Sequence, residues 1–171
     1  MRLPLFVLSF FVLSFFVPVS VLLLSVPAPP AAAWVDPTTG RPSAARVTRA
    51  ASIPEKNWQR GHRGVDLDSS PGDVILAAGD GVVAFAGSVA GVPSVSVDHP
   101  DGIRTTYQPV HARVAVGDPV GEGQPIGVLG HSTAHDGVHW GALTGPDTYI
   151  NPLALLATPA IRLKPVDTRI E

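Results

Sequence analysis

The sequence predicts an all-β fold, a compact antiparallel β-sandwich built from short hairpins. From Pro54 to Ala157, short runs rich in Val, Ile, Thr and aromatic residues alternate with Gly, Asp and Pro, and many turns carry Asp-Gly or Gly-Asp pairs. No window in this stretch has the apolar spacing of an amphipathic helix. Short strands with tight turns and no helices favour stacked hairpins.

The strand candidates follow one another closely along the chain. In order, they are residues 64–67, 73–78, 80–89, 93–99, 103–110, 125–130, 137–143 and 148–150. Each run mixes β-branched or aromatic residues with small ones, which suits a pleated, half-buried surface. The final "PLALLA" (152–157) predicts one short turn of helix.

The start of the chain predicts the compartment. Arg2 precedes an apolar run over 3–26, and "PAPPAAAW" follows it. This pattern is typical of a secretory signal peptide over 1–33, with a retained N-terminal membrane anchor as the alternative. On both interpretations the rest of the chain is extracytoplasmic. Residues 34–53 predict a linker or loosely packed lead-in, 54–157 the folded domain, and 158–171 a peripheral tail.

Composition excludes several other classes. The 171 residues include 12 Lys and Arg against 14 Asp and Glu, for a net charge of −2. The chain therefore has no basic footprint for nucleic acid. It also has no Cys, so neither a disulfide nor a thioether lipid anchor is available. A secreted domain of this kind must be held by its own core or by a metal.

Two segments carry candidate metal ligands. "GHRGVD" contains His62 and Asp66, which an extended strand would separate by roughly 13 Å. A shared metal therefore requires the backbone to bend, and Gly61 and Gly64 make bending easy; the alternative is a loop His beside a turn Asp. In "GVHWGAL", His139 falls on the glycine-bearing face of a predicted strand; the alternative is a partly buried strand His.

Five motifs in order resemble a known family. "GHRGVDL", "PGDVILAAGDGVVAFAG", "VSVDHPDGIRTTYQPV", "VAVGDPVGEGQPIGVLG" and "GVHWGAL…YINPLALL" together resemble the lysostaphin/LytM-type zinc endopeptidases of bacterial cell walls. The resemblance covers about residues 57–157. It implies a barrel-sandwich hybrid fold with a groove, peptidoglycan as the partner, and one Zn²⁺ held by His62, Asp66 and His139. Two nitrogens, one carboxylate and an open position suit a catalytic zinc.

The chain departs from this family at both auxiliary histidines. The first His of the family's H-x-H motif corresponds to Gly137, and the His of its Tyr-x-His-Leu strand corresponds to Pro109. Hydrolysis needs groups that move the proton and stabilise the oxyanion, which Gly and Pro side chains cannot do. His135 and His111, each two residues away, are candidate substitutes; the alternative places both in loops at the groove rim.

Three further residues are candidates for the substrate groove. Trp140 and Tyr107 offer aromatic area for a sugar-peptide ligand, with core packing as the alternative. Arg63 offers a cation for a substrate carboxylate, with a solvated loop charge as the alternative. His99 is predicted to be structural, and His131 has no predicted role.

Two functions remain open from the sequence. One is a zinc endopeptidase that cuts peptide cross-bridges of peptidoglycan, with His135, His111 or water replacing the missing groups. The other is an inactive relative that binds peptidoglycan or regulates a cell-wall hydrolase, because both auxiliary histidines are lost while all three metal ligands are kept.

Overall fold

The computed structural model describes residues 34–157. The expected signal peptide or anchor (1–33) and the expected tail (158–171) lie outside the described residues. Within 34–157, no helix has the length and apolar character needed to cross a bilayer.

The described residues form short strands and one 3₁₀ turn. The strands are β1 (Val47–Arg49), β2 (Val65–Leu67), β3 (Val74–Leu76), β4 (Gly81–Val89), β5 (Val92–Asp98), β6 (Arg104–Gln108), β7 (Val110–Ala112), β8 (Pro119–Val120), β9 (Pro125–Leu129), β10 (Val138–Leu143) and β11 (Tyr149–Ile150). The 3₁₀ turn is η1 (Pro152–Ala154) and is capped by Asn151, whose side chain accepts a hydrogen bond from the Leu153 N–H. Every strand expected from the sequence is present, and the expected run over 103–110 is divided at Pro109.

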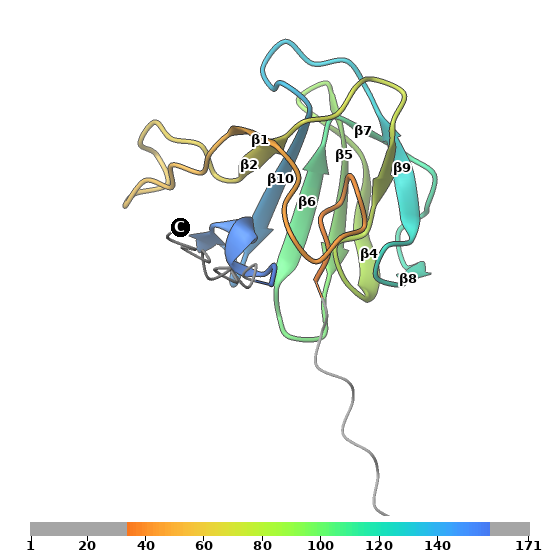
Figure 1. The fold of residues 1–171 in the computed structure, drawn as a ribbon. Coiled ribbons are helices and arrows are strands. Elements are labelled where there is room, and N and C mark those ends of the chain that lie inside the picture. Colours follow the sequence, from red (N-terminus) through yellow and green to blue (C-terminus); the bar gives the residue numbers. More distant parts are fainter. Residues whose placement is uncertain (1–33, 158–171) are drawn as a thin grey trace, which may run out of the picture.

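The strands form two antiparallel sheets, which confirms the all-β prediction. The larger sheet has the order β1-β2-β10-β6-β5-β4-β8, with β11 paired to β10, and the smaller has the order β3-β9-β7. The smaller sheet contacts the larger one through β7, which lies against β5 and β4 (Figure 1). The larger sheet has two free ends, so it is open rather than a closed barrel.

The core fills the space between the sheets. Tyr107 and Trp140 from the larger sheet and Ile75 and Ile126 from the smaller sheet are fully buried in one apolar cluster. Burying a side chain of this size contributes about 1.5–3 kcal/mol. The strands that carry the metal candidates, β2 and β10, are anchored in this core by the flanking residues Val65 and Trp140.

Residues 34–53, expected to form a linker or loosely packed lead-in, instead pack on the domain. Val35 donates its N–H to the Ala78 carbonyl at 2.8 Å, and β1 pairs with β2. Asp36 is fully buried, and its carboxylate accepts hydrogen bonds from the N–H groups of Thr38 and Ala45, each at 2.7 Å. The sequence did not reveal this because turn and pairing contacts leave no apolar periodicity.

A chain of buried hydrogen bonds fixes the end of β5. His99 has its Nδ1 2.7 Å from the Asp80 carbonyl and its Nε2 2.8 Å from the Thr105 hydroxyl, which lies 2.9 Å from the Tyr107 hydroxyl. The Tyr107 hydroxyl accepts the Ala78 N–H at 2.9 Å. Because burial dominates, the pKa of Tyr107 is raised to about 12. His99 therefore has the structural role expected of it.

This environment predicts a pH dependence of stability. Burial lowers the pKa of His99 from 6.5, although the Asp80 carbonyl opposes the shift. The unfolded chain therefore takes up the proton more readily, and the free energy of unfolding falls as pH drops through about 6.5. We expect His99→Gln to weaken this fall, by at most about 1.4 kcal/mol per pH unit for one proton.

Urea unfolding of the zinc-free chain between pH 5 and 8 measures the slope in both proteins. Other groups of the chain contribute to both slopes equally, so only the difference between the two slopes reports on His99. Equal slopes in the wild type and His99→Gln would contradict the prediction.

Candidate metal centre

The register of β2 and β10 brings two of the predicted ligands together. Asp66 and His139 are directly opposite each other across the antiparallel pair. Side chains at opposite positions of neighbouring strands share a face and lie close. The Asp66 Oδ1 and His139 Nδ1 atoms are accordingly 2.9 Å apart.

His62 joins them because the chain bends just before β2. Its Nε2 lies 2.9 Å from Asp66 Oδ1 and 3.0 Å from His139 Nδ1. Both glycines expected at the bend have a steric reason to be glycine. A Cβ at Gly61 would lie 2.5 Å from the Ser52 carbonyl oxygen, and one at Gly64 would lie 2.4 Å from the Trp140 carbonyl oxygen and 2.7 Å from the His139 ring.

The bend is held by the segment expected to be a linker. Ser52 and His62 exchange two backbone hydrogen bonds, at 2.8 and 2.9 Å. His62 Nδ1 lies 2.9 Å from the Ala50 carbonyl, which can only accept, so Nδ1 carries the proton. The lone pair of His62 is therefore on Nε2, the atom that faces Asp66 and His139. A carbonyl partner that fixes the tautomer in this way is typical of metal-ligating histidines.

The structure adds a fourth member, His135. Its Nδ1 lies 2.9 Å from Asp66 Oδ1, and one potential ligand atom from each of His62, Asp66, His135 and His139 lies within 4.8 Å of the other three. These four residues are called the metal cluster below. His135 was predicted as a substitute for the missing catalytic His; the structure places it among the predicted metal ligands.

The donor set suits a divalent cation. Ligand atoms about 2 Å from one ion lie about 3 Å apart, the spacing seen between Asp66 Oδ1 and each imidazole nitrogen and between His62 Nε2 and His139 Nδ1. Asp66 Oδ1 is near three imidazole nitrogens, and its buried Oδ2 has no hydrogen-bond partner among the described residues. A lone pair of His62 facing a carboxylate oxygen is repulsive unless a positive charge lies between them. Imidazole nitrogens with one carboxylate fit Zn²⁺.

The protonation states also suit a metal. Burial alone would raise the pKa of Asp66, but hydrogen bonds from His135 and His139 outweigh it, so that pKa lies well below its usual range. Burial lowers the pKa of His139, although its hydrogen bond to Asp66 opposes the shift. Near neutral pH, Asp66 is ionised and His139 is neutral, the states in which both bind metal.

The other candidate substitute, His111, is outside the metal cluster. It lies in β7 opposite Val128, is exposed, and rests against Gly130. It belongs to the smaller sheet, whereas Asp66 and His139 belong to the larger one. The chain turns from one sheet to the other at Pro109, which separates β6 from β7 and carries His111 with the smaller sheet.

Gly137 cannot be replaced by the family's histidine in this backbone. Its φ is +102°, a conformation that favours glycine, and a Cβ there would lie 2.0 Å from the Leu67 carbonyl oxygen. The path of the backbone at position 137 therefore excludes a histidine.

For two of the three residues expected in the substrate groove, the prediction was wrong because both side chains are buried. Tyr107 and Trp140 are both fully buried in the core, so neither lines a groove. Both sit on the inward face of their strands, and their large apolar area fills the space between the sheets. Arg63 is partly exposed; it donates to the carbonyls of Asn57 and Gln59 and lies 5.8 Å from the Tyr149 ring.

One hollow adjoins the metal cluster, and a second lies beside the loop that contains Trp58. One is bordered by His135 and Gly137 and also by Ser69 and Leu129. The other lies by the loop that Arg63 holds, and is lined by Lys56, Trp58, Asp147 and Tyr149, among others. Trp58 is 83% exposed there, a large aromatic surface with no partner in the core.

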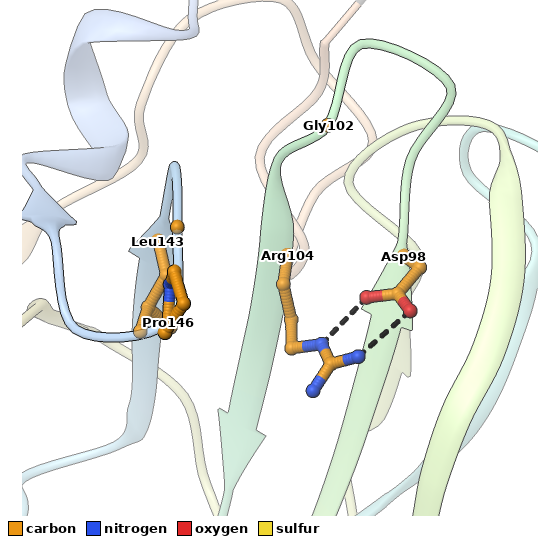
Figure 2. A pocket seen from close by; sticks show the side chains of 6 residues that line it. Asp98, Gly102, Arg104, Leu143 and Pro146 are labelled. Carbon is orange, nitrogen blue, oxygen red and sulfur yellow. Dashed lines mark hydrogen bonds and ion pairs between the residues drawn. The ribbon is translucent and has the colours of Figure 1, made fainter.

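A further hollow lies away from the metal cluster. Figure 2 shows Asp98, Gly102, Arg104, Leu143 and Pro146 around it, with Arg104 making two hydrogen bonds to Asp98 at 2.5 and 2.8 Å. Leu143 is four residues from His139 along β10, or roughly 13 Å. This hollow is therefore separate from the metal cluster.

Sequence reasoning missed two groups that support the metal cluster. Ala50 supplies its carbonyl to His62, and the Thr48 hydroxyl lies 2.7 Å from the Asp136 carbonyl and 3.1 Å from the Asp66 carbonyl. Both come from residues 34–53. A backbone carbonyl carries no sequence signal, and a Thr in a polar stretch carries almost none.

Comparison with known proteins agrees with this geometry. The family model described as peptidase family M23 matches residues 60–152, which include the whole metal cluster. The chain belongs to peptidase family M23. An uncharacterized protein of Mycobacterium tuberculosis (strain H37Rv) is 46% identical over 131 residues, which cover 71% of this chain and 52% of that protein. The chain thus spans about half the length of the curated relatives it matches.

Two solved structures have folds similar to that of this chain. Csd3 of Helicobacter pylori is 29% identical with a TM-score of 0.57, over 77% of this chain and 37% of that one. The catalytic domain of the antimicrobial peptidase lysostaphin from Staphylococcus simulans is 23% identical with a TM-score of 0.52, over 62% and 86%. These matches confirm the lysostaphin-type resemblance and the antiparallel fold.

Proposed function

We propose that this M23 chain is an extracytoplasmic zinc-dependent peptidase that hydrolyses peptide cross-bridges of peptidoglycan. The observation that carries the proposal is the convergence of His62, Asp66 and His139, with the tautomer of His62 fixed by the Ala50 carbonyl. Bound zinc supplies a Lewis acid that activates water and polarises an amide carbonyl. The buried carboxylate of Asp66 offsets part of the ion's charge.

One surface hollow of the domain suits a sugar-peptide ligand. The hollow lined by Trp58 and Tyr149 offers flat aromatic area next to the charged groups of Lys56 and Asp147. Aromatic rings with a polar edge suit such mixed ligands. In this proposal Arg63 positions the loop that carries Trp58, through its hydrogen bonds to Asn57 and Gln59.

The lack of a catalytic side chain at positions 137 and 109 favours a second function. Neither Gly137 nor Pro109 has a side chain that can accept a proton or stabilise an oxyanion, and His111 lies with the smaller sheet. A domain with this deficit suits a non-catalytic role, in which it binds peptidoglycan or regulates a cell-wall hydrolase.

Digestion of purified cell wall separates the two functions. The zinc-loaded chain is incubated with wall, and new amine termini are counted beside Asp66→Ala and, as a matched control, His131→Ala. His131 is exposed and outside the metal cluster. Release by the wild type and His131→Ala but not by Asp66→Ala supports the peptidase. Release that survives Asp66→Ala refutes the zinc mechanism, and co-sedimentation with wall without release supports the binding role.

A further inference from the structure

We infer that His135 is a fourth protein ligand of the metal, so that the site in this conformation is closed and opens only when residues 131–135 move. The inference rests on the proposed zinc site and concerns its regulation. It assigns His135 to metal binding rather than to the catalytic substitution expected from the sequence.

The direction of the His135 ring supports ligation over proton transfer. Its Nδ1 lies 2.9 Å from Asp66 Oδ1, the same oxygen that His62 and His139 approach, and its ring centre is 4.5 Å from that of His139. A general base must instead reach the proton of the attacking water or of the substrate. Here the ring nitrogen points at the ligand atoms themselves.

The backbone after His135 is fixed in the position this requires. The Thr48 hydroxyl lies 2.7 Å from the Asp136 carbonyl, and the Val138 N–H donates to the Ser69 hydroxyl at 2.9 Å. Between them the chain passes so close to Leu67 that only glycine fits at 137. The close passage that excludes a histidine at 137 also brings His135 to the metal cluster.

The same contacts indicate which ligand can leave. His62 is buried and its second ring nitrogen is held by the Ala50 carbonyl. The His135 side chain is 20% exposed, and within residues 34–157 its ring makes no hydrogen bond except to Asp66. Residues 131–134 before it are all exposed. His135 is therefore the least constrained of the four.

Four protein ligands change what the site does. Zinc sites with four protein ligands are structural, whereas catalytic sites keep a position open for water or substrate. With His135 in place, the three imidazoles and one carboxylate fill all four positions. The chain is then latent, and displacement of His135 by a ligand in the adjoining hollow is the step that exposes the metal.

Cobalt substitution of the full chain, purified in mild detergent because of its apolar start, tests this. Co²⁺ reports coordination through its visible spectrum, and azide probes for an open position. We expect the wild type and the control His131→Ala to bind one Co²⁺ with a four-coordinate spectrum that azide does not change. We expect His135→Ala to bind on the order of 10–100-fold more weakly, with a spectrum that azide shifts.

Each other outcome contradicts the inference. Unchanged Co²⁺ affinity and azide response in His135→Ala, with circular dichroism like the wild type, would show that His135 is no ligand and would leave the proposed zinc site intact. If azide already shifts the Co²⁺ spectrum of the wild type, His135 is likewise no ligand and the proposed zinc site remains. No Co²⁺ or Zn²⁺ binding by the wild type would remove the proposed function together with the inference.

Discussion

Asp66→Asn is expected to lower zinc affinity by on the order of 100-fold or more. Asp66 supplies the only carboxylate of the metal cluster, and its Oδ1 lies 2.9 Å from one nitrogen of each of the three histidines. Asn keeps the shape of the side chain but removes the negative charge. Competition with a fluorescent zinc chelator measures the affinity of both proteins.

Asp68→Asn is the matched control for this change. Asp68 follows β2 immediately and its side chain is 55% exposed, with one long contact of 3.9 Å to Arg46. The same loss of charge two residues away should leave zinc affinity within about twofold of the wild type, because exposed pairs contribute little. Equal affinities in Asp66→Asn and the wild type would show that zinc binds elsewhere.

Gly137→Ala is expected to produce the largest loss of stability among glycine changes in the domain. Alanine at a φ of +102° is strained, at a cost of about 1–3 kcal/mol. The new Cβ would also lie 2.0 Å from the Leu67 carbonyl oxygen, which forces the backbone to shift and adds about 2 kcal/mol or more. Gly137→His would meet the same obstacle, so it should disrupt the site rather than restore the family's catalytic histidine.

Gly72→Ala isolates the contribution of close packing. Gly72 has a φ of +100°, but a Cβ at this position would have no atom within 4 Å apart from its chain neighbours. It should therefore show the backbone strain alone, and the difference between the two variants in urea unfolding gives the cost of the contact with Leu67. Equal losses of stability in Gly137→Ala and Gly72→Ala would contradict the close approach of residue 137 to Leu67, on which the position of His135 depends.

The fold was predictable from the sequence because most of its strands are marked by a local pattern of residues. The runs that became β4, β5 and β10 combine β-branched residues with Gly and Asp turns. The two-residue strand β8 (Pro119–Val120) is too short to leave a pattern. Residues 34–53 were misjudged because they are ordered by the carboxylate of Asp36 and by pairing with β2, which are contacts between distant positions.

The sequence was enough to predict which residues are the metal candidates, and the structure supplied the rest of their arrangement in space. His62 and Asp66 needed a bend at Gly61 and Gly64, and the structure has that bend. The place of His135 depends on how the chain passes Leu67 and on anchors at Thr48 and Ser69. The burial of Tyr107 and Trp140 depended on which face of each strand met the other sheet. Spacing along one strand does not determine these features.

The most direct test of the account is anomalous diffraction at the zinc edge from crystals of the chain grown with Zn²⁺. We predict one peak per chain, within ligand distance of His62 Nε2, an Asp66 carboxylate oxygen and His139 Nδ1. A peak at another position, or no peak at the metal cluster in crystals that contain zinc, would contradict the account.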